Sequence, residues 1–103
     1  MQYDIETIRA NRLKWYEALR SGEYEQCQNE MFSGNKCCCL GVASRVVLNN
    51  YSDKRDYLKV YSALGIDYFL SNSIIALNDD SKLLFSQIAD KIENNPKEYY
   101  KEI

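Results

Sequence analysis

Residues 36–41 read KCCCLG, and another cysteine stands at position 27. A thiol can serve as a metal ligand, a nucleophile or a small apolar side chain. In an extended segment, neighbouring side chains point to opposite faces, so Cys37 and Cys39 would face one way and Cys38 the other. Adjacent cysteines therefore do not converge on one tetrahedral ion, and the CxxC spacing of zinc sites is absent. We expect no metal and no cofactor, and we expect the thiols to pack as small apolar groups.

The chain contains no histidine. This absence removes the commonest general acid or base and the commonest metal ligand, and it excludes Ser-His-Asp and Cys-His catalysis. Cys39, at a predicted helix N-terminus, could have a lowered pKa, but it has no histidine as a partner base. We therefore expect a protein that is not an enzyme. A hydrolase that uses Asp79 with Cys39 is the least favoured alternative.

Polar side chains gather in RSGEYEQ at 20–26 and in LNDDS at 77–81. Short polar residues at a helix-to-helix corner usually bind backbone amides, which is the first interpretation of the second cluster. The alternative is a ligand site, in which a guanidinium binds phosphate, amides and a carboxylate bind the polar edges of a nucleotide, and an aromatic ring stacks on its base. The candidate ligand-binding residues are Trp15, Arg20, Tyr24, Gln26, Asn78 and Asp79.

The elements that must position these residues follow from periodicity and capping signals. Apolar residues at three- and four-residue steps predict a helix over about 5–21, with Asp4 as N-cap, Gly22 as its stop and a buried stripe that includes Ile5. Alternation then predicts a β-hairpin with arms near 26–32 and 36–39, joined by Ser33–Gly34–Asn35. A short apolar helix of about 40–48 follows.

In the second half, Ser52 or Asp53 is the expected N-cap of a helix through KRDYLKVYSAL, which ends at Gly65–Ile66. Ser73 is expected to cap a helical turn that ends at Asn78, and Asp80 or Ser81 to start a last helix that ends at Asn95–Pro96. Residues 96–103 form an expected tail, ordered only against a partner. The predicted buried stripe of the third helix is Tyr57, Leu58, Tyr61 and Leu64. The fold class is α+β: an α-rich small domain with four to five helices packed around one β-hairpin.

Length and composition limit the classes of function. The 103 residues, of which 46% are hydrophobic, predict a single domain over 1–103. The net charge of −2 is spread along the chain, so we expect no binding of duplex nucleic acid, which requires a clustered positive face. The apolar runs are short of a membrane span and the start lacks the pattern of a signal peptide, so we expect no membrane partner and a reducing cytosol.

At WYEALRSGEYEQ, CCLGVASRV, LND and FSQIADKIE the chain resembles a family of small proteins widespread in bacteriophage and prophage genomes. The family pattern is W-x-x-A-L-R-S-G-x-Y-x-Q, then C-C-L-G-V, L-N-D and F-x-x-I-A-D-x-I-E. The matching stretches span about three-quarters of the chain. The family usually has glycine where this chain has Cys27, and often an aromatic residue where it has Cys37, so these departures weaken the case that any one thiol is essential.

This resemblance implies a phage-encoded protein in the cytoplasm of the host bacterium. Small phage accessory proteins often counter host immunity. We expect a homo-oligomeric counter-defence protein that sequesters a nucleotide-derived immune signal without catalysis. The alternative is a protein–protein inhibitor of a host defence protein such as a CRISPR nuclease (an anti-CRISPR). In that case the DYFLSNS loop and the EYYKEI tail would be the contact points.

Overall fold

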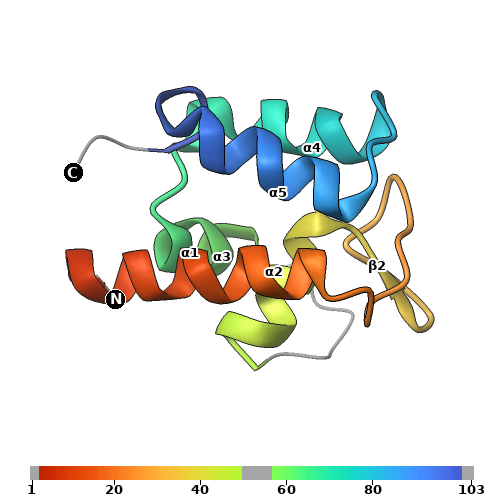
Figure 1. The fold of residues 1–103 in the computed structure, drawn as a ribbon, viewed down its shortest axis with the longest axis horizontal. Helices are drawn as coiled ribbons and strands as arrows, with labels where there is room; N and C mark the ends of the chain where they lie inside the picture. The colour runs from red at the N-terminus through yellow and green to blue at the C-terminus, as the bar shows by residue number, and fades with distance from the viewer. Residues whose placement is uncertain (1–2, 50–56, 101–103) are drawn as a thin grey trace.

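The structure is a computed structural model that describes residues 3–49 and 57–100 (Figure 1). Its helices and its two-stranded antiparallel hairpin confirm the predicted α-rich α+β class. The elements are α1 (Ile5–Arg20), β1 (Phe32–Ser33), β2 (Lys36–Cys37), α2 (Cys39–Val47), α3 (Tyr57–Leu64), η1 (Tyr68–Leu70), α4 (Ser71–Asp79), α5 (Phe85–Asn94) and η2 (Pro96–Glu98).

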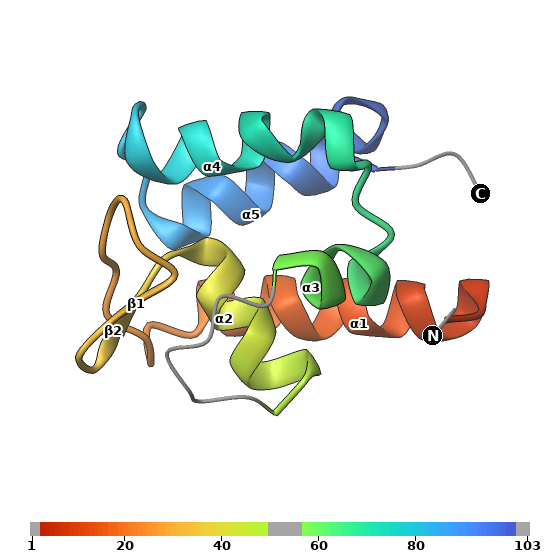
Figure 2. The same ribbon diagram turned by 180° about the vertical axis from the view of Figure 1, so that it is seen from behind.

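The helices form two groups, and the hairpin lies at one end of the molecule (Figures 1 and 2). Helix α1 packs against α2 and α3, and its other side packs against α5. Helix α4 packs against α5 and contacts α2. The side chains of Trp15, Leu40, Leu64, Ile74 and Ile88 are fully buried where these elements meet. Within the described part of the chain, none of the helices is both long and apolar enough to span a membrane.

Both predicted ends of α1 are confirmed. The Asp4 side chain accepts a hydrogen bond from the Thr7 N–H at 2.7 Å, and Gly22 follows the helix with a φ of 77°. The placement of Ile5 in the buried stripe is wrong, because this residue stands in the first turn, ahead of Ile8, the first buried residue of the helix.

The hairpin turns where the sequence predicts, but both arms are shorter, and the second ends at Cys37 because α2 begins at Cys39. Phe32 pairs with Cys37 and Ser33 with Lys36 around a turn in which Gly34 has a φ of 60°. The prediction of a strand from residue 26 is wrong, because Asn29 adopts a left-handed φ of 68° that interrupts the extended run. The chain at 25–27 nevertheless contacts β2, since the Cys27 N–H donates to the Cys37 carbonyl at 2.9 Å.

Helix α3 ends as predicted, while its predicted N-cap residues lie outside the described residues. Gly65 has a φ of 67°, and the Ile66 N–H donates to the Tyr61 carbonyl at 2.9 Å, which confirms the hydrophobic C-cap. The prediction that Leu58 is buried is wrong. Val60 is buried instead, because the covered face of α3 includes Val60 and Tyr61 and leaves Leu58 on the outside.

The predicted starts of the last two long helices are also wrong. Helix α4 follows directly on η1, whose cap is Asp67, and so begins before Ser73. Helix α5 begins after Leu84 rather than at Asp80 or Ser81. The reason is that Lys82 has a left-handed φ of 52° and holds the preceding residues in a turn. The Leu84 N–H is capped by the Gln87 side chain at 2.9 Å.

The prediction that residues 96–103 form a tail is wrong for 96–100. After η2 the side chains of Tyr99 and Tyr100 are buried, because distant parts of the fold cover them. Tyr100 forms an antiparallel bridge with Ile66, its hydroxyl is hydrogen-bonded to that of Tyr16, and the Arg12 guanidinium carbon lies 3.6 Å from the centre of its ring. This segment therefore closes the core between α1 and the end of α3.

Candidate functional site

The Asn78 carboxamide is the centre of a buried hydrogen-bond network near the end of α4. Its side chain is almost fully enclosed, with 1% of the residue exposed. Its Oδ1 accepts from the Gln26 Nε2 at 2.9 Å and from the Cys39 backbone N–H at 3.2 Å. Its Nδ2 donates to the Cys27 carbonyl at 2.8 Å and to the Asp79 Oδ1 at 2.8 Å. One amide thus joins the segment before the hairpin, the start of α2 and the end of α4.

Gln26 and Asp79 extend this network. The Gln26 Nε2 also donates to the Leu83 carbonyl at 2.7 Å, and the Asp79 Oδ1 accepts from the Asn29 N–H at 2.9 Å. The structure therefore brings together Gln26, Asn78 and Asp79, and their hydrogen-bond partners include backbone groups. These contacts confirm that the LND corner binds backbone amides. The ligand-binding role of these residues stays a prediction.

Trp15 and Arg20 lie outside this network. The Trp15 ring is fully buried, it stacks near Tyr16, and its Nε1 donates to the Cys39 carbonyl at 2.8 Å. No face of that ring is open to a nucleotide base. The Arg20 guanidinium donates to Asp90 at 2.7 Å and to Glu93 at 2.8 Å, so its charge is opposed by two carboxylates of α5.

Three of the candidates do line one shallow depression. Arg20, Tyr24 and Gln26 border it together with the start of α5 at Phe85 and Ser86. Its volume is about 320 Å³, which is near the lower end of the range for ligand sites, about 300–1,000 Å³. Arg20 at the end of α1 and two residues of the following segment, Tyr24 and Gln26, thus border one depression.

The thiols are buried and free rather than activated. Burial raises the pKa of Cys37 to about 11 and that of Cys38 to about 12. Burial, with the nearby Cys38 and Asp79, raises the pKa of Cys39 well above its ordinary value. The lowered pKa that a nucleophilic Cys39 would need is therefore contradicted. Across residues 3–49 and 57–100, no group of His, Cys, Asp and Glu side chains is arranged to hold a metal ion.

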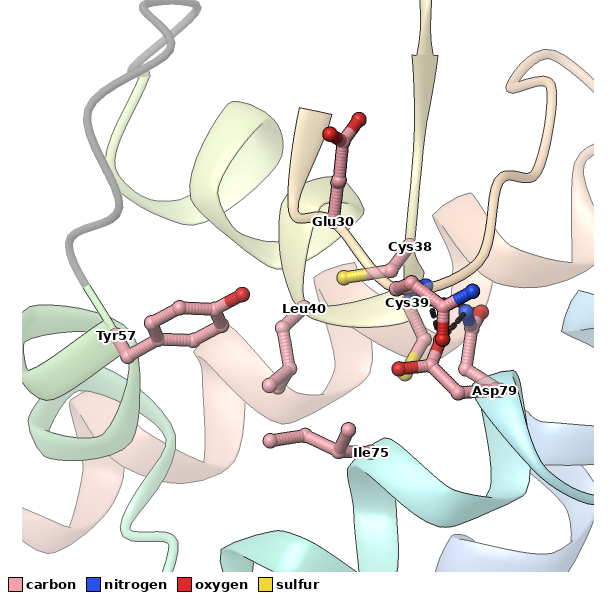
Figure 3. A pocket seen from close by; sticks show the side chains of 9 residues that line it. Glu30, Cys38, Cys39, Leu40, Tyr57, Ile75 and Asp79 are labelled. Atoms are coloured by element: carbon pink, nitrogen blue, oxygen red, sulfur yellow. Dashed lines mark hydrogen bonds between the residues drawn. The ribbon is translucent and has the colours of Figure 1, made fainter. Parts of the chain in front are cut away.

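A small pocket lies beside the network, between the start of α2, the start of α3 and the end of α4 (Figure 3). Its volume is about 110 Å³. The hydrocarbon parts of Leu40 and Ile75 and the ring of Tyr57 face one part of it, and Cys38 and Asp79 face the other (Figure 3). The sequence singled out Asp79 here, but it did not indicate that Tyr57 and Ile75 would lie near it.

An aromatic row leads from this pocket to the surface. It consists of Tyr57, Tyr61, Tyr68 and Phe69, whose successive ring centres are 6.2, 6.4 and 5.9 Å apart. Tyr61 is buried, whereas Tyr68 is 61% and Phe69 is 89% exposed. These two residues belong to the DYFLSNS segment that the sequence suggested as a protein contact. The other suggested contact, EYYKEI, has its tyrosines in the core.

Comparison with known proteins yields a family and no function. No curated protein and no solved structure matches the chain. The family described as "Domain of unknown function (DUF8296)" matches residues 8–63, which is more than half of the chain and includes most of α1, the hairpin, α2 and most of α3. The protein therefore belongs to the DUF8296 family.

Proposed function

We propose that the protein acts without catalysis, by binding another protein through Tyr68 and Phe69. The observation that carries this proposal is the 89% exposure of the Phe69 side chain beside a Tyr68 that is 61% exposed. Aromatic side chains are enriched among the residues that dominate binding energy at protein interfaces. Burial of a phenylalanine side chain contributes about 1.5–3 kcal/mol, so these rings supply a substantial part of a binding energy.

Hydrogen bonds fix the backbone that carries the two rings before any partner arrives. The Asp67 side chain accepts from the Phe69 N–H at 2.9 Å, and the Ser71 hydroxyl donates to the Tyr68 carbonyl at 2.7 Å. The Tyr68 ring meets the Phe69 ring edge to face and is itself supported by Tyr61. A rigid anchor loses little conformational entropy on binding, which favours affinity.

The resemblance to small phage proteins supports a target class. It favours a defence protein of the host bacterium, such as a CRISPR nuclease, and action in the host cytoplasm. The buried thiols with raised pKa values and the absence of histidine support inhibition by binding rather than by chemistry.

The test is recovery of a partner from a defence-positive host, followed by affinity measurement with the purified partner. Phe69→Ala is compared with Leu13→Ala, a matched control on α1 whose side chain is also exposed. Loss of an anchor ring should weaken binding by about 30-fold or more, since such anchors contribute about 2 kcal/mol or more. Equal affinity of both variants would contradict the proposal. So would a native mass spectrum in which Phe69→Ala only dissociates a homo-oligomer, because the rings would then contact a second copy.

A second candidate function is sequestration of a nucleotide-derived signal. The observation that favours it is the depression lined by Arg20, Tyr24 and Gln26. Calorimetry with cyclic dinucleotides, cyclic trinucleotides and cyclic ADP-ribose variants tests it. Heat of binding that disappears in Tyr24→Ala would support this candidate, and absence of heat and of a thermal shift would eliminate it.

A further inference from the structure

The pocket of Figure 3 has two carboxylates among its lining residues. They belong to Asp79 and Glu30, and among the described residues no lysine or arginine lines the pocket. The hydrogen bonds that Asp79 accepts from Asn29 and Asn78 both reach Oδ1, and neither carboxylate has an ion pair with a residue in the described ranges. Of the side-chain charges that act on Cys38, Asp79 raises the pKa of this thiol, and no basic side chain lowers it. A positively charged group is the ligand that this environment favours.

The neighbouring helix ends do not reverse that preference. The pocket lies at the C-terminal end of α4, where the helix dipole favours cations, and at the N-terminal end of α2, where it disfavours them. The Cys39 N–H at the start of α2 is already bound by the Asn78 Oδ1. The two dipole ends oppose each other, so the carboxylates determine the sign of the potential.

The rest of the pocket suits a hydrocarbon chain. Leu40 and Ile75 line it with apolar surface, and the Tyr57 ring borders it (Figure 3). An engineered cavity of about 150 Å³ accommodates benzene, so 110 Å³ takes about four to five non-hydrogen atoms. A lysine side chain beyond its Cα has a matching size: a chain of methylene groups that ends in an ammonium. An arginine side chain is longer and ends in a planar group that needs more room.

We propose that this pocket binds the side chain of a lysine from the partner protein, with the ammonium at Asp79 and the methylene groups against Leu40 and Ile75. The inference rests on the proposed protein-binding function and names the chemistry of the partner. The aromatic row supports it, because its ring-to-ring steps of 6.2, 6.4 and 5.9 Å connect Tyr57 at the pocket to Phe69. A partner face of about 800 Å² is about 30 Å across, which is wide enough to contact both the pocket and Phe69.

The test is an NMR titration of the full chain, labelled with ¹⁵N, with n-butylammonium and with 1-butanol, its neutral isostere. We expect millimolar binding of n-butylammonium, shifts of the Asn29, Cys39 and Leu40 amide signals, and at least tenfold weaker binding of 1-butanol. Asp79→Asn keeps an oxygen that can accept from the Asn29 N–H and should weaken n-butylammonium binding at least tenfold. Glu17→Gln, on the exposed side of α1, should leave it unchanged.

If Asp79→Asn does not fold, Glu30→Gln removes the other carboxylate that lines the pocket. Glu30 is exposed, and this substitution should weaken n-butylammonium binding at least threefold. Equal binding of 1-butanol and n-butylammonium, or no binding of either by the wild type, would overturn the proposal. A second arm uses Nα-acetyl-lysine-N-methylamide and its norleucine counterpart. Binding of the lysine compound alone supports a partner lysine, and a pocket that takes n-butylammonium but rejects the lysine compound contradicts it.

These titrations use no protein partner, so their result is separate from that of the Phe69→Ala experiment. If Phe69→Ala binds its partner normally while the wild type binds n-butylammonium, the proposed partner contact at Phe69 is wrong and the proposed amine binding in the pocket is supported. If Phe69→Ala abolishes partner binding while the pocket takes no amine, the lysine proposal alone has failed.

Discussion

The substitution Asn78→Ala should destabilise the protein strongly. It removes the carboxamide that binds the Cys39 N–H and the Cys27 carbonyl, and both residues are buried. A buried backbone group that loses its partner costs about 1–3 kcal/mol, so two such groups cost about 2–6 kcal/mol. A domain of this size is stable by about 5–15 kcal/mol. The substitution should therefore remove a large part of the free energy of unfolding.

Urea denaturation followed by the fluorescence of Trp15, the single tryptophan, measures this effect. With slopes of about 1–3 kcal/mol per molar urea, a loss of about 4 kcal/mol lowers the midpoint by more than about 1 M. Asn72→Ala is the matched control, because Asn72 is an exposed asparagine of the same helix, and it should shift stability by no more than about 0.5 kcal/mol. A change below about 1 kcal/mol for Asn78→Ala would refute the structural role of the network.

The remaining predictions concern packing, pH and a surface ion pair. Gly41→Ala should destabilise by about 1–3 kcal/mol in the same urea assay, since its Cβ would lie 2.7 Å from the Cys37 Cβ; a wild-type midpoint would contradict this. Burial raises the pKa of Cys38 from 9.0 to about 12. Above about pH 9 the unfolded chain therefore loses a proton that the folded chain keeps. The free energy of unfolding should fall by about 1.4 kcal/mol per pH unit for each such thiol until the pH passes the folded-state pKa. Urea midpoints that stay constant from about pH 8 to 10.5 would count against it. Arg20→Ala should lower the free energy of unfolding by at most about 1 kcal/mol, because its ion pairs with Asp90 and Glu93 are exposed. A larger loss of stability in thermal unfolding would contradict this prediction.

Features that depend on a few neighbouring residues could be predicted from the sequence. The Asp4 cap, the left-handed Gly22 and the Gly65–Ile66 C-cap each involve residues within five positions, and each is confirmed. The turn at Ser33–Gly34–Asn35 belongs to the same class. Local chemistry determines these features, whereas the equally local caps expected at Ser73 and at Asp80 or Ser81 are displaced by η1 and by the turn at Lys82.

Features that depend on distant contacts could not be predicted in this way. Ile5 and Leu58 fit a helical stripe, but periodicity does not show which side of the stripe a neighbouring element covers. Tyr99 and Tyr100 follow a proline near the end of the chain, and their burial depends on Ile66, Tyr16 and Arg12.

In the candidate site, too, local features could be predicted and contacts between distant residues could not. The residue types at LND indicated a polar corner, and the structure confirms it. The sequence could not show that Asn78 forms a hydrogen bond with Gln26, 52 positions away, or that Tyr57 and Ile75 would line a pocket beside Asp79. Trp15 had the chemistry of a stacking platform, but the fold uses it in the core.

The Asn78 network also has a kinetic consequence. Its bonds join residues that are 52, 51 and 39 positions apart, so it can form only after long loops have closed, at an entropic cost that precedes the gain. Interactions that form after the rate-limiting step of folding act mainly on the rate of unfolding, and a network that joins such distant segments is expected to belong to this class. The network would then set how long each folded molecule persists before it opens, and with that its lifetime against proteases.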